Sequence, residues 1–96
     1  MSASDIRLED LGRGRGRYAA TIDGHTAELT FIRRPGGVLV ADHTGVPDAL
    51  GGKGVGKALV QRLVADARAL GLKITPSCSF IEAHFRRNPD WADLRA

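Results

Sequence analysis

Hydrophobic and polar residues alternate along the first half of the chain with the period of two that is typical of strands. The alternation runs from residue 18 to 22, and an Asp-Gly pair at 23–24 separates it from a second alternating stretch at 25–32. This arrangement favours a tight antiparallel hairpin. A second turn, Arg-Pro-Gly-Gly at 34–37, leads into the apolar run VLVA at the start of a strand at 38–46. The pattern therefore predicts three antiparallel strands in sequence.

The period changes to three and four residues after residue 54. An apolar stripe recurs at this spacing, formed by Val55, Leu59, Leu63, Ala67 and Leu70. Such a stripe predicts a long amphipathic helix, with Gly71 as its C-terminal cap. Residues 72–75 are predicted as a short strand parallel to the third one, because a helical crossover joins the two.

A second, shorter helix is predicted near the C-terminal end of the sequence. Ser79 and Glu82 have the S-x-x-E spacing of a capping box, and the helix should run to about Asn88 and stop at Pro89. The expected fold class is α/β (α+β), with a mixed, mainly antiparallel sheet. A length of 96 residues is enough for a single domain, 1–96, with a modest core.

The segment GGKGVGKALV at 51–60 matches parts of two phosphate-binding motifs. Gly51, Gly56 and Lys57 fit the P-loop, but Ala58 replaces the hydroxyl residue that binds Mg²⁺, and the predicted sheet is mostly antiparallel. The dinucleotide fingerprint fails, because Lys57 stands where its third glycine belongs. Both motifs nevertheless share one physical feature, which is a run of small residues that exposes backbone N–H groups at a helix N-terminus. We expect a pyrophosphate here; the alternative is that the glycines only allow a tight turn.

Composition and charge limit the kinds of partner and the cellular location that the sequence favours. The formal net charge of +3 and the pI near 9.6 favour an anionic partner. No apolar run approaches the ~20 residues of a membrane span, and the start, MSASDIRLED, lacks the features of a secretory signal. One cysteine cannot form an internal disulfide. These features predict a cytoplasmic protein with no membrane partner.

The order of elements and motifs resembles the GCN5-related N-acetyltransferases, whose central motif is Q/R-x-x-G-x-G/A. Gly54 and Gly56 match its two small positions, while Gly51 departs from its Q/R position. The segments HTGVPDALGGKGVGKALV and GLKITPSCSFIEAHFRRNPDW are similar to the minimal, single-domain YjdJ-type acetyltransferase-like proteins. The resemblance covers about residues 18–91.

The resemblance implies a protein that binds acetyl-CoA, without a metal, and transfers acetyl to an amine. It assigns the pyrophosphate to the loop and the helix N-terminus, and the pantetheine arm to backbone at the end of the preceding strand. The residues implied are Val46 for pantetheine, and Lys53, Gly54, Val55, Gly56 and Lys57 for pyrophosphate.

Two residues are candidates for catalysis. Cys78 precedes the second predicted helix, whose dipole would favour a thiolate, and the resemblance implies a role as acetyl acceptor or proton carrier; the alternative is a small buried side chain at a strand end. His43 near the end of the third strand is a candidate base. The family commonly has an acidic residue two positions later, where this chain has Gly45. His84 is expected to pack against its neighbours and not to catalyse.

Two other functions remain open at this stage. The segment GRGRGR at 12–17 is typical of weak phosphate binding by nucleic-acid proteins, but only one aromatic, Tyr18, lies near it, and a solvated strand or loop explains it as well. A module that binds acyl-CoA without transferring it is the other alternative. The amine acceptor, whether protein or small molecule, cannot be read from the sequence, and a protein partner that completes the cleft is a further expectation.

Overall fold

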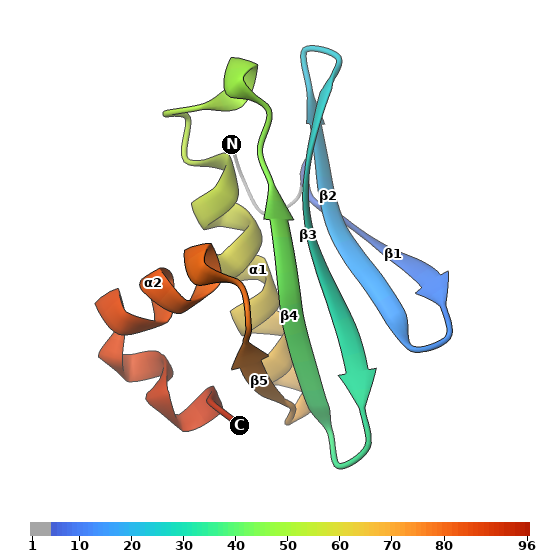
Figure 1. Ribbon diagram of the computed structural model, residues 1–96, viewed down its shortest axis with the longest axis vertical. Coiled ribbons are helices and arrows are strands. Elements are labelled where there is room, and N and C mark those ends of the chain that lie inside the picture. Colours follow the sequence, from blue (N-terminus) through green and yellow to red (C-terminus); the bar gives the residue numbers. More distant parts are fainter. Residues whose placement is uncertain (1–4) are drawn as a thin grey trace.

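The strands form one sheet in their order along the chain, β1-β2-β3-β4-β5 (Figure 1). The computed structural model describes residues 5–96. The strands are β1 (Arg7–Gly12), β2 (Arg15–Ile22), β3 (His25–Arg34), β4 (Val38–Gly45) and β5 (Lys73–Pro76). The first four pair antiparallel and β5 pairs parallel with β4, so the predicted mixed, mainly antiparallel sheet is confirmed.

One strand was not predicted. β1 is an edge strand whose residues are nearly all exposed, so it lacks the alternation that reveals a half-buried strand. The GRGRGR segment runs from the end of β1 through the turn at Arg13 and Gly14 into β2, with Arg13 at φ 56°. Four strands, not three, therefore precede the glycine loop.

Two α-helices complete the fold, α1 (Val55–Leu70) and α2 (Ser79–Arg87), and α1 lies behind the sheet in Figure 1. The predicted bounds of α1 are confirmed, including the left-handed cap at Gly71 with φ 70°. Short 3-10 turns, Asp48–Leu50 and Pro89–Leu94, precede α1 and follow α2. No helix in the described part of the chain is long and apolar enough to cross a membrane.

The predicted capping box does not form. Cys78 is the N-cap of α2, and no side-chain hydrogen bond caps the helix. Ser79 is already the first helical residue, so its hydroxyl is one position too late to cap. The Glu82 carboxylate instead lies 2.9 Å from the Arg95 guanidinium, which holds it away from the helix start.

The core lies between α1 and the sheet. The α1 stripe buries Leu59, Leu63 and Ala67 completely, although Leu70 at its end is 68% exposed. Tyr18 on β2 is also buried, and its hydroxyl donates a 2.8 Å hydrogen bond to Asp66 of α1. This packing holds α1 against the sheet, with the glycine loop leading from β4 into the start of the helix.

Candidate functional site

The glycine loop leads into α1, and no side chain caps the first N–H groups of this helix. Gly54 is the N-cap, in the left-handed conformation with φ 72°, and it offers no side chain to the helix. The first helical hydrogen bond runs from the Ala58 N–H to the Gly54 carbonyl, at 3.0 Å. The N–H groups of Val55, Gly56 and Lys57 precede it, so the helix start can accept an anion.

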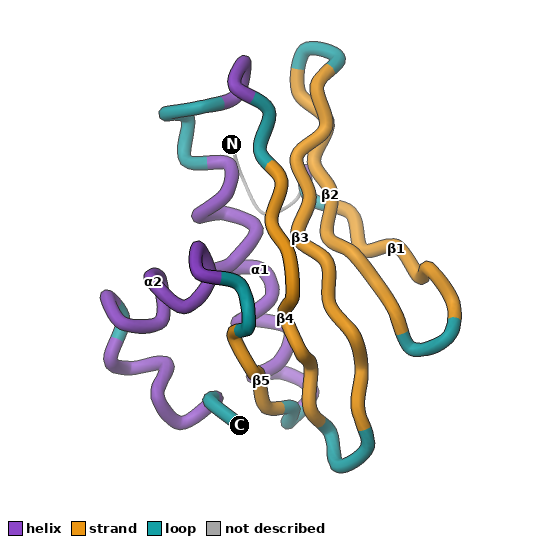
Figure 2. The backbone as a smooth tube through the Cα atoms, viewed as in Figure 1, coloured by secondary structure: helices purple, strands orange, loops and turns teal. Residues whose placement is uncertain are grey.

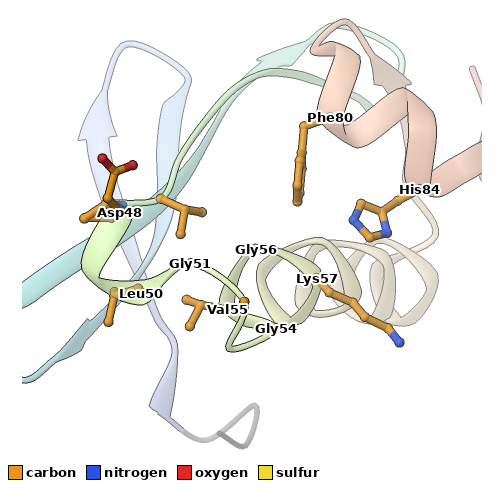
Figure 3. Close-up of a pocket in the computed structure, with 12 residues that line it drawn as sticks. Asp48, Leu50, Gly51, Gly54, Val55, Gly56, Lys57, Phe80 and His84 are labelled. Carbon is orange, nitrogen blue, oxygen red and sulfur yellow. The ribbon is translucent and has the colours of Figure 1, made fainter.

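A cavity of about 420 Å³ opens beside this helix start (Figure 3). The glycine loop forms one wall and α2 forms the other, through Phe80 and His84. Val46, just beyond the end of β4, lines the cavity where the loop begins. The cavity therefore joins a strand end to an open helix N-terminus, the arrangement that the expected ligand requires.

Gly56 allows α2 to approach α1 closely. A Cβ atom at Gly56 would lie 2.7 Å from Cζ of Phe80 and 3.4 Å from Cγ2 of Val46, closer than the ring could tolerate without moving. The Phe80 ring points toward this turn of α1 in Figure 3, and its centroid is 4.7 Å from that of His84. Phe80 and Gly56 thus close the cavity on the α2 side.

His84 is buried beside positive charges. Burial is the main cause that lowers the pKa of its imidazole below the usual 6.5, and the charges of Arg87 and Lys57 act in the same direction. Both effects favour the neutral form of the imidazole. A negatively charged ligand beside Lys57 would offset these effects.

β4 and β5 separate at the level of the site (Figure 2). Their pairing ends at Ala41 and Pro76, and β4 continues to Gly45 without a β5 partner. The Ala41 carbonyl accepts the N–H groups of Ser77 and Cys78, at 2.9 and 3.2 Å, which turns the chain away from β4 and into α2. The β5 side of the β4 end is left open to an extended ligand.

Cys78 lies at this separation, bonded to β4. Its Sγ is 3.0 Å from the Thr44 hydroxyl oxygen. Burial is the largest single influence and raises the pKa of the thiol. The hydrogen bonds from the Thr44 hydroxyl and from the backbone N–H groups of Ile81, Phe80 and Thr44 together outweigh burial, so the net shift of the pKa is downward. The hydrogen-bond donors around the α2 start thus shift the pKa of this thiol in the direction that favours a thiolate.

His43 lies on the other side of the sheet from α1, with a side chain that is 56% exposed. Its Nε2 is 3.5 Å from the carboxylate of Glu28 on β3, and no hydrogen bond joins it to Cys78 among residues 5–96. Glu28 pairs across the strands with Gly45, where a Cβ would lie 3.3 Å from the His43 Nε2. Glu28 on β3 therefore gives His43 an acidic neighbour that Gly45 does not provide.

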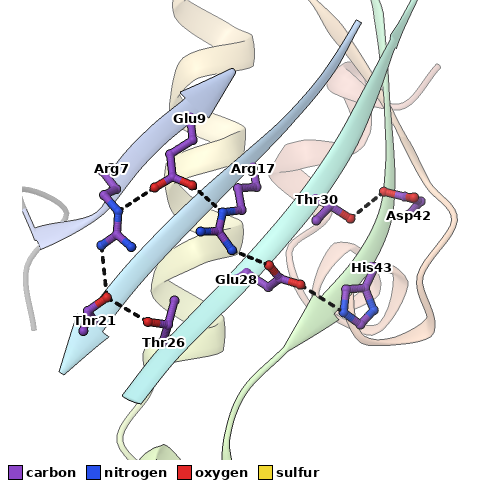
Figure 4. Close-up of polar contacts among 9 residues, drawn as sticks. All are labelled: Arg7, Glu9, Arg17, Thr21, Thr26, Glu28, Thr30, Asp42 and His43. Carbon is purple, nitrogen blue, oxygen red and sulfur yellow. Dashed lines mark hydrogen bonds and ion pairs between the residues drawn. The ribbon is translucent and has the colours of Figure 1, made fainter. Parts of the chain in front are cut away.

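Glu28 is held in turn by a chain of ion pairs across the open face of the sheet (Figure 4). Arg17 donates to Glu28 at 2.8 Å and also bonds to Glu9, which Arg7 contacts at 2.7 Å. The chain spans β1 to β4. It explains the position of Glu28, which sequence reasoning did not single out.

The predicted site residues are only partly brought together. Most of the predicted coenzyme residues line the cavity, namely Val46, Gly54, Val55, Gly56 and Lys57. Lys53 lies in the loop, exposed, and does not line the cavity. Cys78 and His43 do not line it either, and they lie on opposite sides of the β4 end.

A mixed sheet that opens between β4 and β5, with a glycine loop leading into a helix, defines an α+β class of fold. The comparisons specify the family. Residues 17–94 match the family model described as GCN5-related N-acetyl-transferase. The chain belongs to this family, whose members generally use acyl-CoA.

One solved structure matches almost the whole chain. It is the solution structure of "a GCN5-like putative N-acetyltransferase from Staphylococcus aureus", 32% identical, with a TM-score of 0.69. The match covers 97% of this chain and 90% of that one. No curated protein gives a significant match. The fold expected from the sequence, an α+β acetyltransferase-like sheet with two helices, is thereby confirmed.

Proposed function

We propose that this protein binds acetyl-CoA and transfers the acetyl group from the thioester to an amine. The observation that carries the proposal is the cavity between Val46, the open α1 N-terminus and α2. The helix N–H groups and Lys57 suit a pyrophosphate, because both favour negative charge. The open β4 edge suits the amides of the pantetheine arm, which can pair with it as a strand does.

Acetyl transfer needs few catalytic groups from the protein, because the thioester is already activated. The amine nitrogen attacks the carbonyl carbon, the C–S bond breaks, and the amine's proton must leave for a base while the coenzyme thiolate is released. His43, oriented by Glu28, is the base in a direct transfer. In a transfer through the protein, the Cys78 thiolate first takes the acetyl group and then passes it to the amine.

An acyl-CoA-binding module without transfer is the second candidate, and one observation favours it. Cys78 and His43 lie outside the cavity and are not hydrogen-bonded to one another. Release of free coenzyme A thiol from acetyl-CoA in the presence of an amine pool separates the two functions. Steady thiol release supports the enzyme; tight binding with no release over hours supports the module.

Coenzyme A binding through the loop is tested by Gly56→Glu. The new side chain enters the cavity wall and places a carboxylate at the anion site, so we expect a loss of at least ~2 kcal/mol in binding. Calorimetry measures the affinity, and circular dichroism checks the fold. Unchanged affinity in a folded variant would remove the phosphate role of the loop.

Lys57 and Lys53 form a matched pair for the same test. Lys57 lines the cavity and Lys53 does not, although both lie beside the glycines. We expect Lys57→Gln to weaken coenzyme A binding, to leave phosphate-free pantetheine binding unchanged, and to matter less at high salt. Lys53→Gln is expected to have a smaller effect. Equal effects would mean that the lysines act only through overall charge.

A further inference from the structure

A second cavity, of about 340 Å³, lies beside the β1–β2 turn. This turn is at the lower right of Figure 1, across the sheet from the glycine loop at the upper left. The cavity opens on the sheet face that carries α1, because its residues Leu8 and Gly16 pair with Tyr18 and Phe31, whose rings pack together on that face. It is separate from the site described above.

The floor of this cavity is apolar and built for close packing. A Cβ atom at Gly16 would lie 2.5 Å from Cζ of Phe31, so the absent side chain is what lets the ring lie on β2. Leu8 lies beside it on β1 and is 51% exposed, and Leu11 nearby is 48% exposed. Leu8 and the half-buried Phe31 ring thus give the cavity an exposed apolar surface.

The rim of the cavity is positively charged. Arg13 in the turn and Arg33 on β3 line it, and neither guanidinium is ion-paired or hydrogen-bonded within residues 5–96. Of the two acidic residues at the rim, Glu9 is ion-paired, whereas Asp10 keeps its charge and uses its carboxylate in the turn. Glu9 bonds to Arg7 and Arg17, and the Asp10 carboxylate accepts the Gly12 N–H at 2.8 Å to hold the turn.

We propose that this cavity is a docking site for an acidic peptide segment that carries an apolar side chain. The apolar residue fills the space over Phe31 and Leu8, and carboxylates before and after it pair with Arg13 and Arg33. The GRGRGR segment has a role in this proposal that the sequence alone did not reveal. Its glycines form the turn and allow Phe31 to pack, and its Arg13 supplies a free charge.

The apolar floor favours a peptide over a nucleic acid. Binding to single-stranded nucleic acid relies on aromatic rings exposed for stacking, whereas Phe31 is packed against Gly16 and Tyr18 and the exposed residues are leucines. A partner's Leu or Phe side chain matches this surface. The arginines then select acidic neighbours.

The test uses the full chain and a short fluorescein-labelled peptide of Asp and Glu residues around one Leu. Fluorescence anisotropy at physiological salt should give saturable binding, which weakens about tenfold when Ser replaces the Leu of the peptide. Arg33→Glu, Arg13→Glu and Leu8→Ser should each weaken it by about tenfold, the effect of one lost charge-assisted or buried contact. Circular dichroism checks that each variant is folded.

Matched controls separate a site from a general charge effect. Arg34 is adjacent to Arg33 but points to the other sheet face and does not line the cavity, and Leu70 is an exposed leucine on α1 far along the chain. Arg34→Glu and Leu70→Ser should change peptide binding less than twofold.

Several results would overturn the proposal. One is an equal loss of peptide affinity for Arg33→Glu and Arg34→Glu, and another is the absence of saturable peptide binding. A third is an oligonucleotide of the same charge that binds as tightly as the peptide and whose affinity is unchanged by Leu8→Ser. Analytical ultracentrifugation tests for self-association of the protein. If the protein self-associates and Leu8→Ser abolishes this, a second copy of the chain covers the cavity.

Discussion

At Cys78, burial and hydrogen bonding act on the thiol in opposite directions. Burial raises its pKa, while the Thr44 hydroxyl and backbone N–H groups near the α2 start lower it more. A lowered pKa means that more thiolate is present at neutral pH than for a free cysteine. Since the thiolate is the reactive form, Cys78 should react readily with alkylating agents.

Thr44→Val tests this balance. Removing the hydroxyl leaves the burial in place and deletes the Thr44 side-chain donor, so the thiol pKa should rise and alkylation by iodoacetamide near pH 7 should slow a few-fold, the scale of one hydrogen bond. The rate is followed by mass spectrometry across pH. Thr26→Val, at an exposed position on β3, is the matched control. An unchanged rate profile in Thr44→Val would assign the reactivity to α2 alone.

Residues of the site were predictable where they share a local motif, and not where they meet across strands. Gly54, Val55, Gly56 and Lys57 follow from the loop and helix pattern. Glu28 does not, because its contact with His43 depends on the β3–β4 register, which shifts between Thr30 and Phe31. Such an irregularity leaves no clear mark in the order of residue types.

At the scale of elements, the start of α1 and the middle of α2 meet at His84. Burial and the charges of Arg87 and Lys57 lower its pKa in the free protein. Phosphate bound near Lys57 should raise that pKa, so the complex would take up a proton more easily than the free protein. Coenzyme A should therefore bind more tightly as the pH falls toward the lowered imidazole pKa of the free protein.

His84→Gln isolates this effect. Calorimetry across pH should show a gain in coenzyme A affinity on acidification for the parent chain, and a smaller gain for the variant. Titration of the ligand's own phosphate is common to both proteins and cancels in the comparison. Identical pH profiles would mean that bound phosphate does not change the pKa of His84.

Helices and strands differ in how well the sequence predicted them. α1 has a full apolar stripe and glycine caps at both ends, so its bounds were correct. β1 has no buried face to mark it, and the start of α2 was misassigned because Glu82 bonds to Arg95 from the chain beyond the helix. Elements with their own periodicity were predictable, and those defined by distant partners were not.

For the molecule as a whole, Tyr18 links the sheet to α1. Tyr18→Phe keeps the buried ring and removes the 2.8 Å hydrogen bond to Asp66, which Arg62 also contacts at 3.0 Å. Because Asp66 keeps that partner, we expect a loss of about 1 kcal/mol in unfolding free energy. This corresponds to a melting temperature lower by roughly 4–8 °C for a domain of this size.

Asp66→Ala, which removes the acceptor, completes a double-mutant cycle with Tyr18→Phe. If the hydrogen bond carries the effect, the two changes should be non-additive, with a coupling of about 0.5 kcal/mol or more. Urea unfolding gives the free energies. Additive losses would indicate that Tyr18 stabilises the molecule only through its ring.

The separation of β4 and β5 also bears on the order in which the chain folds. The four antiparallel strands follow one another through short turns, whereas β5 pairs with β4 only across the whole glycine loop and α1. Contacts between distant segments have a larger entropic cost of closure and form late. During synthesis, the local pairings of the meander can form before α1 covers the sheet, while the gap that holds Cys78 exists only after β5 and α2 have emerged. A nascent chain stalled before that point would therefore have the paired strands β1–β4 but not the site in which Cys78 contacts Thr44.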